Sequence, residues 1–240
     1  MSSSPALAGV LFDFNGVLLH DAHLHEQAWH ELSLQLRGRE LSADELRHDV
    51  HGRTNRDILA HLLGRAPSAG ELAALSDRKE AAYRALCLAA GALFQLAPGA
   101  APLLDRLLDA GVPRAIATSS PLANVDFFVA HLGLSRWFAR DAIVYDDGSF
   151  PGKPAPDIYR LAAARLGLPP AACIVLEDAV SGIEAARRAG CGRIIAIGDA
   201  ASHAGGGATS SAVSLAIDHL DRFPISWLPT CADTRPRRPS

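Results

Sequence analysis

Lysine is scarce in this 240-residue chain, which has 23 Lys and Arg residues but only two lysines, Lys79 and Lys153. Arginine supplies almost all of the positive charge, so a general need for cationic side chains does not explain the two lysines. A lysine offers a compact ammonium where arginine offers a broad planar fork. We therefore treat Lys153, which lies in a proline-rich stretch, as a candidate for a role that needs a small, fixed cation.

The sequence also lacks the patterns of several protein classes. Its four cysteines are widely separated and form no C-x-x-C pair, which argues against a disulfide framework or a zinc site and favours a reducing, cytoplasmic setting. A net charge of −3 gives no reason to expect nucleic acid or an anionic membrane as partner. No apolar run has the length of a membrane span, and the first residues lack the basic start of a signal peptide. The cysteines are Cys87, Cys173, Cys191 and Cys231.

The chain does have an apolar run near its N-terminus, residues 10–18, which is interrupted by one carboxylate, Asp13. Large apolar residues in succession predict a strand buried on both faces, as in a parallel sheet. Asp13 would then lie near the carboxyl end of the strand, where open α/β sheets bind their ligands. Gly16 frees the backbone to turn there. This segment is the first candidate for a functional site.

Two patterns follow this strand. Residues 21–94 have apolar side chains at helical spacing and predict an all-helical block, in which Lys79 and Glu80 lie on the polar side of a helix. From residue 98 onwards helices and strands alternate, which predicts a parallel sheet covered by helices, an α/β fold. We expect strands at 114–118, 142–145, 173–176 and 193–197, and helices at 101–110, 122–132, 156–166 and 181–189.

Three further polar signals come directly after expected strands. Thr118 and Ser119 could hold a phosphate oxygen, although a hydroxyl there is more often a helix cap. Lys153 stands in Gly-Lys-Pro-Ala-Pro-Asp, whose prolines would fix an ammonium beside a phosphate; the alternative is an exposed loop lysine. Glu177 and Asp178 would repel each other without a cation and suit Mg²⁺; the alternative is an acidic helix N-terminus.

In order and spacing, these four segments resemble the motifs of the haloacid dehalogenase superfamily, and most closely the branch that contains β-phosphoglucomutase and small sugar-phosphate phosphatases. The resemblance implies a Rossmann-like core, residues 1–18 and 95–228, and a helical cap inserted at 19–94. Residues 229–240 are predicted to be a disordered tail. The resemblance also implies an aspartyl-phosphate formed on Asp13, with Thr118 and Lys153 holding the phosphoryl oxygens. Mg²⁺ would be held by Asp13, the carbonyl of Asn15, Glu177 and Asp178.

Asn15 departs from the family pattern, which has a second aspartate at this position. The resemblance gives that residue the task of protonating the leaving oxygen and then deprotonating water. An amide cannot exchange a proton near neutral pH, and such catalysis is worth roughly a factor of 10²–10⁴. We therefore expect a slow Mg²⁺-dependent phosphatase for small phosphorylated metabolites such as sugar phosphates. The alternatives are a β-phosphoglucomutase-like phosphomutase and a silenced protein that binds a phosphorylated ligand.

The helical block supplies candidate substrate contacts. His25 matches the family's cap-hinge histidine, Arg53 and Arg56 lie in a segment that resembles its specificity loop, and Lys79 stands where relatives often carry a lysine. The neighbouring histidines are interpreted as surface or hinge residues, because helical spacing does not place them all on one face. The Gly-rich run at 205–207 is interpreted as a loop rather than a phosphate cradle. We expect a monomer or weak homodimer.

Overall fold

A computed structural model describes residues 6–50, 53–198 and 210–228. The chain divides into two compact units: Met1–His20 with Leu96–Ser240, here called the core unit, and Asp21–Gln95, here called the helical unit. The Gly-rich run at 205–207, the tail at 229–240 and Cys231 lie outside the described residues. The thiols of Cys87, Cys173 and Cys191 are free. Among the described residues, none of the helices combines the length and the apolar character needed to span a bilayer.

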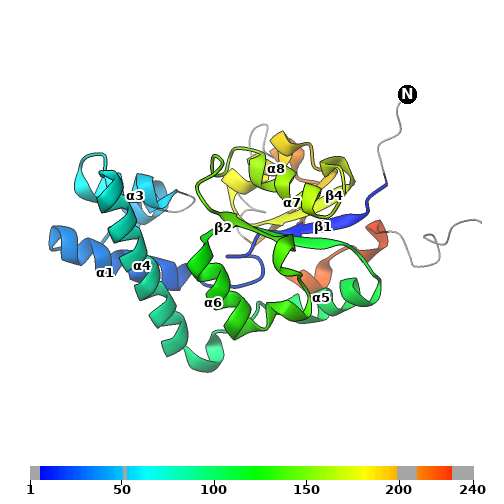
Figure 1. Ribbon diagram of the computed structural model, residues 1–240, viewed down its shortest axis with the longest axis horizontal. Helices are drawn as coiled ribbons and strands as arrows, with labels where there is room; N and C mark the ends of the chain where they lie inside the picture. Colours follow the sequence, from blue (N-terminus) through cyan, green and yellow to red (C-terminus); the bar gives the residue numbers. More distant parts are fainter. Residues whose placement is uncertain (1–5, 51–52, 199–209, 229–240) are drawn as a thin grey trace, which may run out of the picture. The chain divides into compact units, whose positions relative to one another are not determined.

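The core unit contains one six-stranded sheet, in the order β3-β2-β1-β4-β5-β6 (Figure 1). All its neighbouring strands are parallel, which confirms the predicted α/β fold. The first strand of the chain pairs on both sides, with Phe12 opposite Ile116 of one neighbour and Leu176 of the other. The strands are β1 (Gly9–Phe12), β2 (Arg114–Pro121), β3 (Ile143–Asp146), β4 (Cys173–Glu177), β5 (Arg193–Ile197) and β6 (Leu215–Ile217).

Among the described residues of the core unit, four α-helices cover the sheet, with α7 and α8 on one face and α5 and α6 on the other (Figure 1). They are α5 (Ala100–Asp109), α6 (Leu122–Leu132), α7 (Asp157–Arg165) and α8 (Val180–Ala189). Short 3-10 helices lie between and after them, at Leu134–Arg136, Arg140–Ala142, Pro170–Ala172, Ser210–Ala212, Leu220–Arg222 and Ile225–Trp227.

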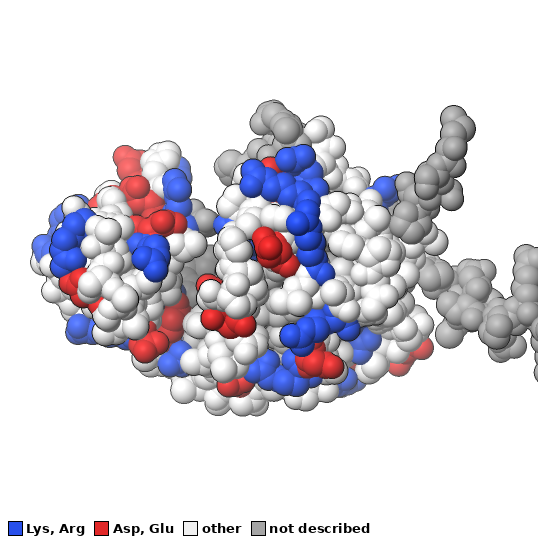
Figure 2. Space-filling model, turned by 45° about the horizontal axis from the view of Figure 1, so that its top comes forward, with Lys and Arg blue, Asp and Glu red and all other residues white. Residues whose placement is uncertain are grey.

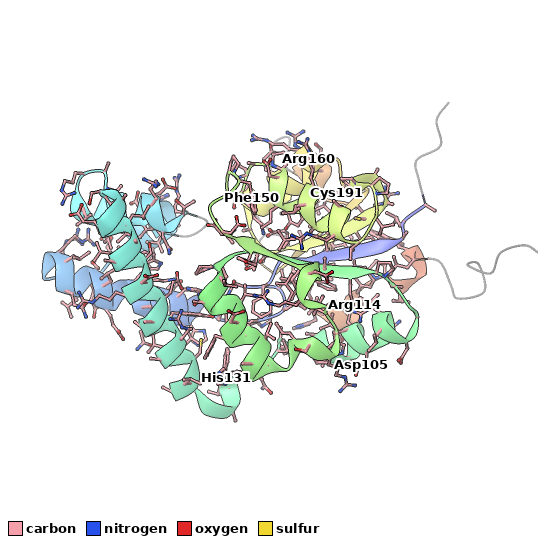
Figure 3. All side chains as sticks on the ribbon, viewed as in Figure 1. Asp105, Arg114, His131, Phe150, Arg160 and Cys191 are labelled. Carbon is pink, nitrogen blue, oxygen red and sulfur yellow. The ribbon has the colours of Figure 1, made fainter. Side chains whose placement is uncertain are left out.

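The core beneath α7 and α8 has small residues on the helices and branched residues on the strands. Alanines of both helices meet Val175 and Ile194 of the sheet, and this lets the helices lie close to it. Phe150 and Cys191 pack against the margin of this cluster (Figure 3). Close packing here fixes α7, which carries Tyr159, relative to the end of β4.

β6 is a strand that the sequence analysis did not predict. It spans only Leu215–Ile217, pairs with β5 through Ile195 opposite Leu215, and is half exposed. A three-residue segment is too short for an alternating pattern to stand out from its surroundings. The strand therefore depends on the edge of β5, with which it pairs.

The helical unit contains α1 (Ala22–Arg37), α2 (Ala43–Glu45), α3 (Asn55–Leu63) and α4 (Ala69–Ala89), with a π-helix at Leu46–Val50 and a 3-10 helix at Gly91–Leu93. α2, α3 and α4 each begin with a capping box, in which the N-cap hydroxyl and an acidic residue three positions later satisfy each other's backbone N–H groups. Its apolar cluster is built from Trp29, Leu32, Leu41, Val50, Ile58, Leu59 and Leu62.

Lys79 and Glu80 do not lie on a polar helix face, contrary to the sequence-based prediction. They are 3% and 6% exposed. Lys79 Nζ lies 2.7 Å from His25 Nδ1 and 3.0 Å from Glu80 Oε1, and 5.1 Å from the ring centre of Trp29. Helical spacing predicted the wrong face because these charges are satisfied by one another and by α1, so their burial leaves no isolated charge. Burial nonetheless lowers the pKa of Lys79 below its ordinary value.

Charges on the visible surface are interspersed in sign (Figure 2). Glu184 of α8, for example, pairs with both Arg187 and Arg188 at 2.6 Å.

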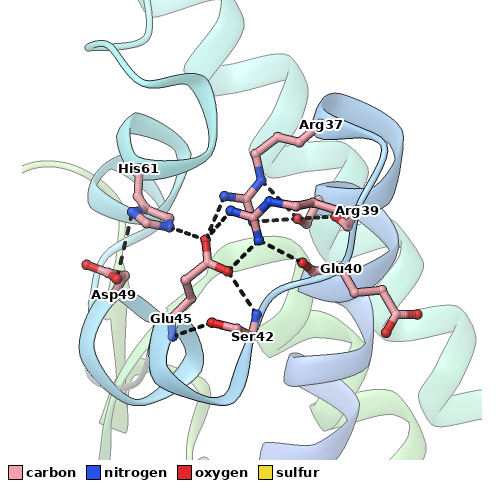
Figure 4. Close-up of polar contacts among 8 residues, drawn as sticks. Arg37, Arg39, Glu40, Ser42, Glu45, Asp49 and His61 are labelled. Atoms are coloured by element: carbon pink, nitrogen blue, oxygen red, sulfur yellow. Dashed lines mark hydrogen bonds and ion pairs between the residues drawn. The ribbon is translucent and has the colours of Figure 1, made fainter.

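In the helical unit, Glu45 contacts several cationic side chains (Figure 4). It accepts from Arg37 and Arg39 at 2.7 Å and contacts His61 Nε2 at 2.8 Å, while it also closes the α2 capping box with Ser42. Hydrogen bonds from Arg39, Ser42 and Arg37 hold the pKa of Glu45 well below its usual range.

We expect Glu45→Gln to destabilise the helical unit by about 1–2 kcal/mol at pH 7, because it weakens a cap and several charged contacts at once. A carboxyl whose pKa falls on folding stabilises the protein above its unfolded pKa, here 4.5, and loses that effect as the pH falls toward its folded pKa. The gap between wild type and variant should thus narrow below about pH 4.5. Thermal melts at several pH values check this, with Glu40→Gln as the charge-matched control; a gap independent of pH would contradict it.

Candidate active site

The carboxyl ends of β1, β2 and β4 carry the polar residues that the sequence analysis singled out. Asp13 follows β1 directly, and its backbone N–H donates to Leu176 O at 3.0 Å, so the start of this turn is tied to β4. Thr118 lies within β2, and Glu177 is the last residue of β4. Since the strands are parallel and in register, these ends meet at one edge of the sheet. Asp13, Thr118 and Glu177 are all buried.

Lys153 reaches this edge from the loop before α7. Its Nζ lies 2.6 Å from Asp13 Oδ1 and 2.5 Å from Glu177 Oε1, and its side chain is 7% exposed. Burial alone would lower the pKa of Lys153, but the Asp13 and Glu177 carboxylates outweigh it and raise that pKa above its ordinary value. The ammonium therefore stays charged. The Lys153–Pro154 peptide bond is cis.

Glu177 is held by four donors. Its Oε1 accepts from Lys153 and from the hydroxyl of Tyr159 at 2.7 Å, and its Oε2 accepts from the backbone N–H groups of Asp178 and Ala179 at 3.0 and 3.1 Å. Burial and this carboxylate raise the pKa of Tyr159 well above its ordinary value, so the hydroxyl remains a donor. A Cβ on Gly182 would lie 1.6 Å from Oε1, so only glycine leaves room for the carboxylate.

Asp13, Glu177 and Asp178 form a group whose oxygens lie within 4.8 Å of one another and could hold a metal ion. When all three carboxyls are ionised, the single positive charge of Lys153 leaves a net charge of −2 in this group, which a divalent cation would neutralise. Burial and the carboxylates of Asp13 and Glu177 raise the pKa of Asp178 to about 8. Gly16 has a φ of +87°, and a Cβ there would lie 1.9 Å from Asp178 Oδ2. The residues thus fit a hard divalent cation such as Mg²⁺.

Asn15 contacts two residues of β2. Ser120 Oγ donates to Asn15 Oδ1 at 2.8 Å, and Thr118 Oγ1 approaches the same oxygen at 3.4 Å. The backbone N–H of Ser120 donates to Thr118 Oγ1 at 3.1 Å, which links the three residues. Because its carbonyl oxygen accepts from hydroxyls, Asn15 presents its amide nitrogen on its other side and can act there only as a hydrogen-bond donor.

The model of the haloacid dehalogenase-like hydrolase family matches residues 7–190. The chain belongs to this family. The predicted superfamily membership is therefore confirmed, and the protein is a hydrolase.

Named relatives of the hydrolase include two proteins of Escherichia coli (strain K12). Hexitol phosphatase A is 35% identical over 191 residues, which cover 79% of this chain and 82% of that protein. Fructose-1-phosphate phosphatase YqaB is 32% identical over 191 residues, which cover 76% of this chain and 93% of that protein. The crystal structure of a HAD hydrolase of family IA, variant 3, from Entamoeba histolytica superposes with a TM-score of 0.83 at 35% identity, covering 92% of this chain and 97% of that one.

The structure of the hydrolase brings together one charged cluster, which consists of Asp13, Lys153, Glu177 and Asp178. Asn15 and Thr118 are hydrogen-bonded to each other. Ser119 is exposed at the end of β2. The other candidate substrate residues lie in the helical unit: Arg53 donates to the carbonyl of His48, Arg56 is exposed, and His25 and Lys79 contact each other. Gly52 of the same segment lies outside the described residues.

Tyr159 and Ser120 are residues of this site that the sequence patterns of the hydrolase did not indicate. Tyr159 looks like an ordinary core residue of α7, since its position fits the apolar face of that helix. Ser120 stands beside two residues that were singled out, but nothing in the sequence says which hydroxyl meets Asn15. The strand alternation offered one signal: Thr118 and Ser120 lie two residues apart and are both buried, whereas Ser119 between them is exposed.

Proposed function

We propose that this hydrolase is a Mg²⁺-dependent phosphatase that acts on small phosphorylated metabolites, sugar or sugar-alcohol phosphates in particular, through an aspartyl-phosphate on Asp13. The observation that carries the proposal is the Asp13 carboxylate, held by Lys153 at the carboxyl end of β1 beside Asp178. The names of the two Escherichia coli relatives, a hexitol phosphatase and a fructose-1-phosphate phosphatase, support the substrate class.

In the first step, an Asp13 carboxylate oxygen attacks phosphorus, the bond from phosphorus to the ester oxygen breaks, and the electron pair leaves with that oxygen. In the second, water attacks phosphorus and releases both phosphate and the Asp13 carboxylate. Lys153 and Thr118 hold the phosphoryl oxygens, so their part is positioning and neutralising charge. The metal would be held by Asp13, Asp178 and the backbone carbonyl of Asn15, and it would neutralise charge on the phosphoryl group.

Glu177 contributes its negative charge to this site through its ion pair with Lys153. Since its two oxygens already accept four hydrogen bonds, we infer that its main contact is the ammonium and that any contact with the metal is indirect. The helical unit would serve as the cap, with His25, Arg53, Arg56 and Lys79 as the residues through which it influences substrate choice. The cytoplasmic location and the monomeric or weakly dimeric state remain predictions.

Asn15 limits the rate in this proposal. Its amide can stabilise the leaving oxygen by donating a hydrogen bond, but it cannot give that oxygen a proton or take one from water. Turnover is therefore slow, and substrates whose leaving group departs without a proton are favoured. A phosphomutase would need the same proton transfer at a sugar hydroxyl, which makes it the less favoured alternative.

The first experiment measures hydrolysis of p-nitrophenyl phosphate and of a hexitol phosphate by the full chain, with Mg²⁺ and with excess chelator. Wild type should turn over both substrates only with the metal, and Asp13→Ala should lose activity at least 10³-fold because it removes the nucleophile. Activity that survives Asp13→Ala would contradict the proposed intermediate. An inactive wild type that binds the hexitol phosphate tightly would favour the silenced phospho-ligand binder instead.

A further inference from the structure

Tyr159 occupies a place between the packed core and the charged cluster. It lies on α7 with no exposed surface and packs among the apolar residues beneath that helix. Its hydroxyl donates to Glu177 Oε1 at 2.7 Å, and Lys153 Nζ lies 5.1 Å from the centre of its ring. One side chain therefore touches both members of the Lys153–Glu177 ion pair, with its hydroxyl on the anion and its ring face on the cation.

We propose that Tyr159 is the positioning residue of Lys153: its hydroxyl and ring together set where the ammonium stands between Asp13 and Glu177. The proposal rests on the proposed function for the meaning of that position, since Lys153 is the group that holds the phosphoryl oxygens. Tyr159 itself touches no reacting atom.

The contacts of Glu177 explain why a hydroxyl is needed. Oε2 is fixed by two backbone N–H groups, whereas Oε1 is shared between Lys153 and Tyr159. Without the hydroxyl, Lys153 would be the main donor to Oε1, and the full acceptor strength of that oxygen would draw the ammonium away from Asp13 Oδ1. The hydroxyl thus divides the pull of Glu177 and keeps Lys153 within 2.6 Å of the nucleophile.

The aromatic ring of Tyr159 also restrains the ammonium of Lys153. A lysine ammonium near an aromatic face is attracted to it without a directional hydrogen bond, so the ring supports the cation while its N–H groups remain directed at oxygens. Gly182 completes the enclosure, because the space beside Oε1 is too small for a Cβ. Gly182 and the two backbone N–H groups on Oε2 therefore restrain Glu177 beside the ammonium.

The contrasting interpretation is that Tyr159 only fills the core. In that case Tyr159→Phe, which keeps the ring and its packing, would change neither the surroundings of Lys153 nor catalysis. The scarcity of lysine makes the difference measurable. With only Lys79 and Lys153 in the chain, lysine labelled with ¹³C at Cε and ¹⁵N at Nζ gives two side-chain signals. Lys79 is an internal control because it belongs to the helical unit.

We expect the wild-type spectrum to contain a nuclear Overhauser contact between the Lys153 ε-protons and the Tyr159 ring, assigned with Lys79→Arg. Its absence in the folded protein would overturn the proposal without any variant at position 159. Tyr159→Phe should move the Lys153 Nζ signal and leave the Lys79 signal in place. An unmoved Lys153 signal in the folded variant would also overturn it.

Kinetics supply the second arm. Tyr159→Phe should lower kcat/KM for p-nitrophenyl phosphate on the order of tenfold, as for the loss of one hydrogen bond to a charged group, and Tyr145→Phe in the same unit should leave it unchanged. A Tyr159→Phe variant whose kcat/KM equals that of wild type would mean that Tyr159 only fills the core and does not position Lys153. If wild type hydrolyses no phosphate ester, the proposed function fails, and the spectra still decide the position of Lys153.

Discussion

Lys153→Met should lower the free energy of unfolding of the core unit by about 3–5 kcal/mol, the usual cost of removing one partner from a buried ion pair. The lysine contacts two carboxylates, Asp13 and Glu177, whose side chains are 10% and 1% exposed. Methionine fills similar space but leaves both of them, and Asp178 beside them, without an ammonium. Hydrolysis should be lost as well, because the variant no longer holds the phosphoryl oxygens.

Urea unfolding at pH 7 measures this cost. Arg140→Met is the matched control, since it removes a cation from an exposed pair with Asp126 and should change stability by no more than about 0.5 kcal/mol. Mg²⁺ should restore part of the stability of Lys153→Met by binding the carboxylates of the folded state. A cost below about 1 kcal/mol in the absence of Mg²⁺ would mean that the carboxylates are protonated or hydrated, contrary to the geometry described above.

The positions of Asp13, Thr118, Lys153 and Glu177 at one sheet edge could be predicted because local patterns were enough. Each lies at or just after an apolar strand, or in a proline-stiffened loop, and parallel strands bring such ends together without any knowledge of individual contacts. The same logic gave the positions of α5 to α8 and of every strand except β6 to within a few residues. Local rules were therefore enough to predict that these side chains lie close together.

Contacts that depend on three-dimensional packing could not be predicted from the sequence. Tyr159 and Glu177 are 18 residues apart, and Ser120 and Asn15 are 105 apart, and neither pair has a local signature. For Lys79 and Glu80 the sequence-based prediction was wrong, because the helical pattern assigned them to the polar face. They are buried because residues of other helices bind them: His25 contacts Lys79, and Asn55 donates to Glu80. From sequence alone a charged side chain is predicted to be exposed, because the residue that pairs with it in the folded protein is not known.

Asn15→Asp should raise the turnover of alkyl phosphates by roughly 10²–10⁴, the range that general acid–base catalysis supplies. The substitution keeps the shape of the side chain, and the hydroxyls of Ser120 and Thr118, which now approach Asn15 Oδ1, can donate equally well to a carboxylate. The new carboxyl can protonate the leaving oxygen and then take a proton from water. Steady-state rates with p-nitrophenyl phosphate and with a hexitol phosphate test this directly.

The two substrates separate the two steps. A nitrophenolate leaves without a proton, so in wild type its release should be fast and the slow attack of water should let phosphoenzyme accumulate; acid quenching during turnover measures that fraction. Asn15→Asp should lower the fraction and raise the rate, and its gain should be larger for the hexitol phosphate, where both steps need a proton. Asn15→Ala, which removes the amide without adding a carboxyl, should remain slow. A fast wild type with little phosphoenzyme would mean that another group carries the proton, and the role assigned to position 15 would then be wrong.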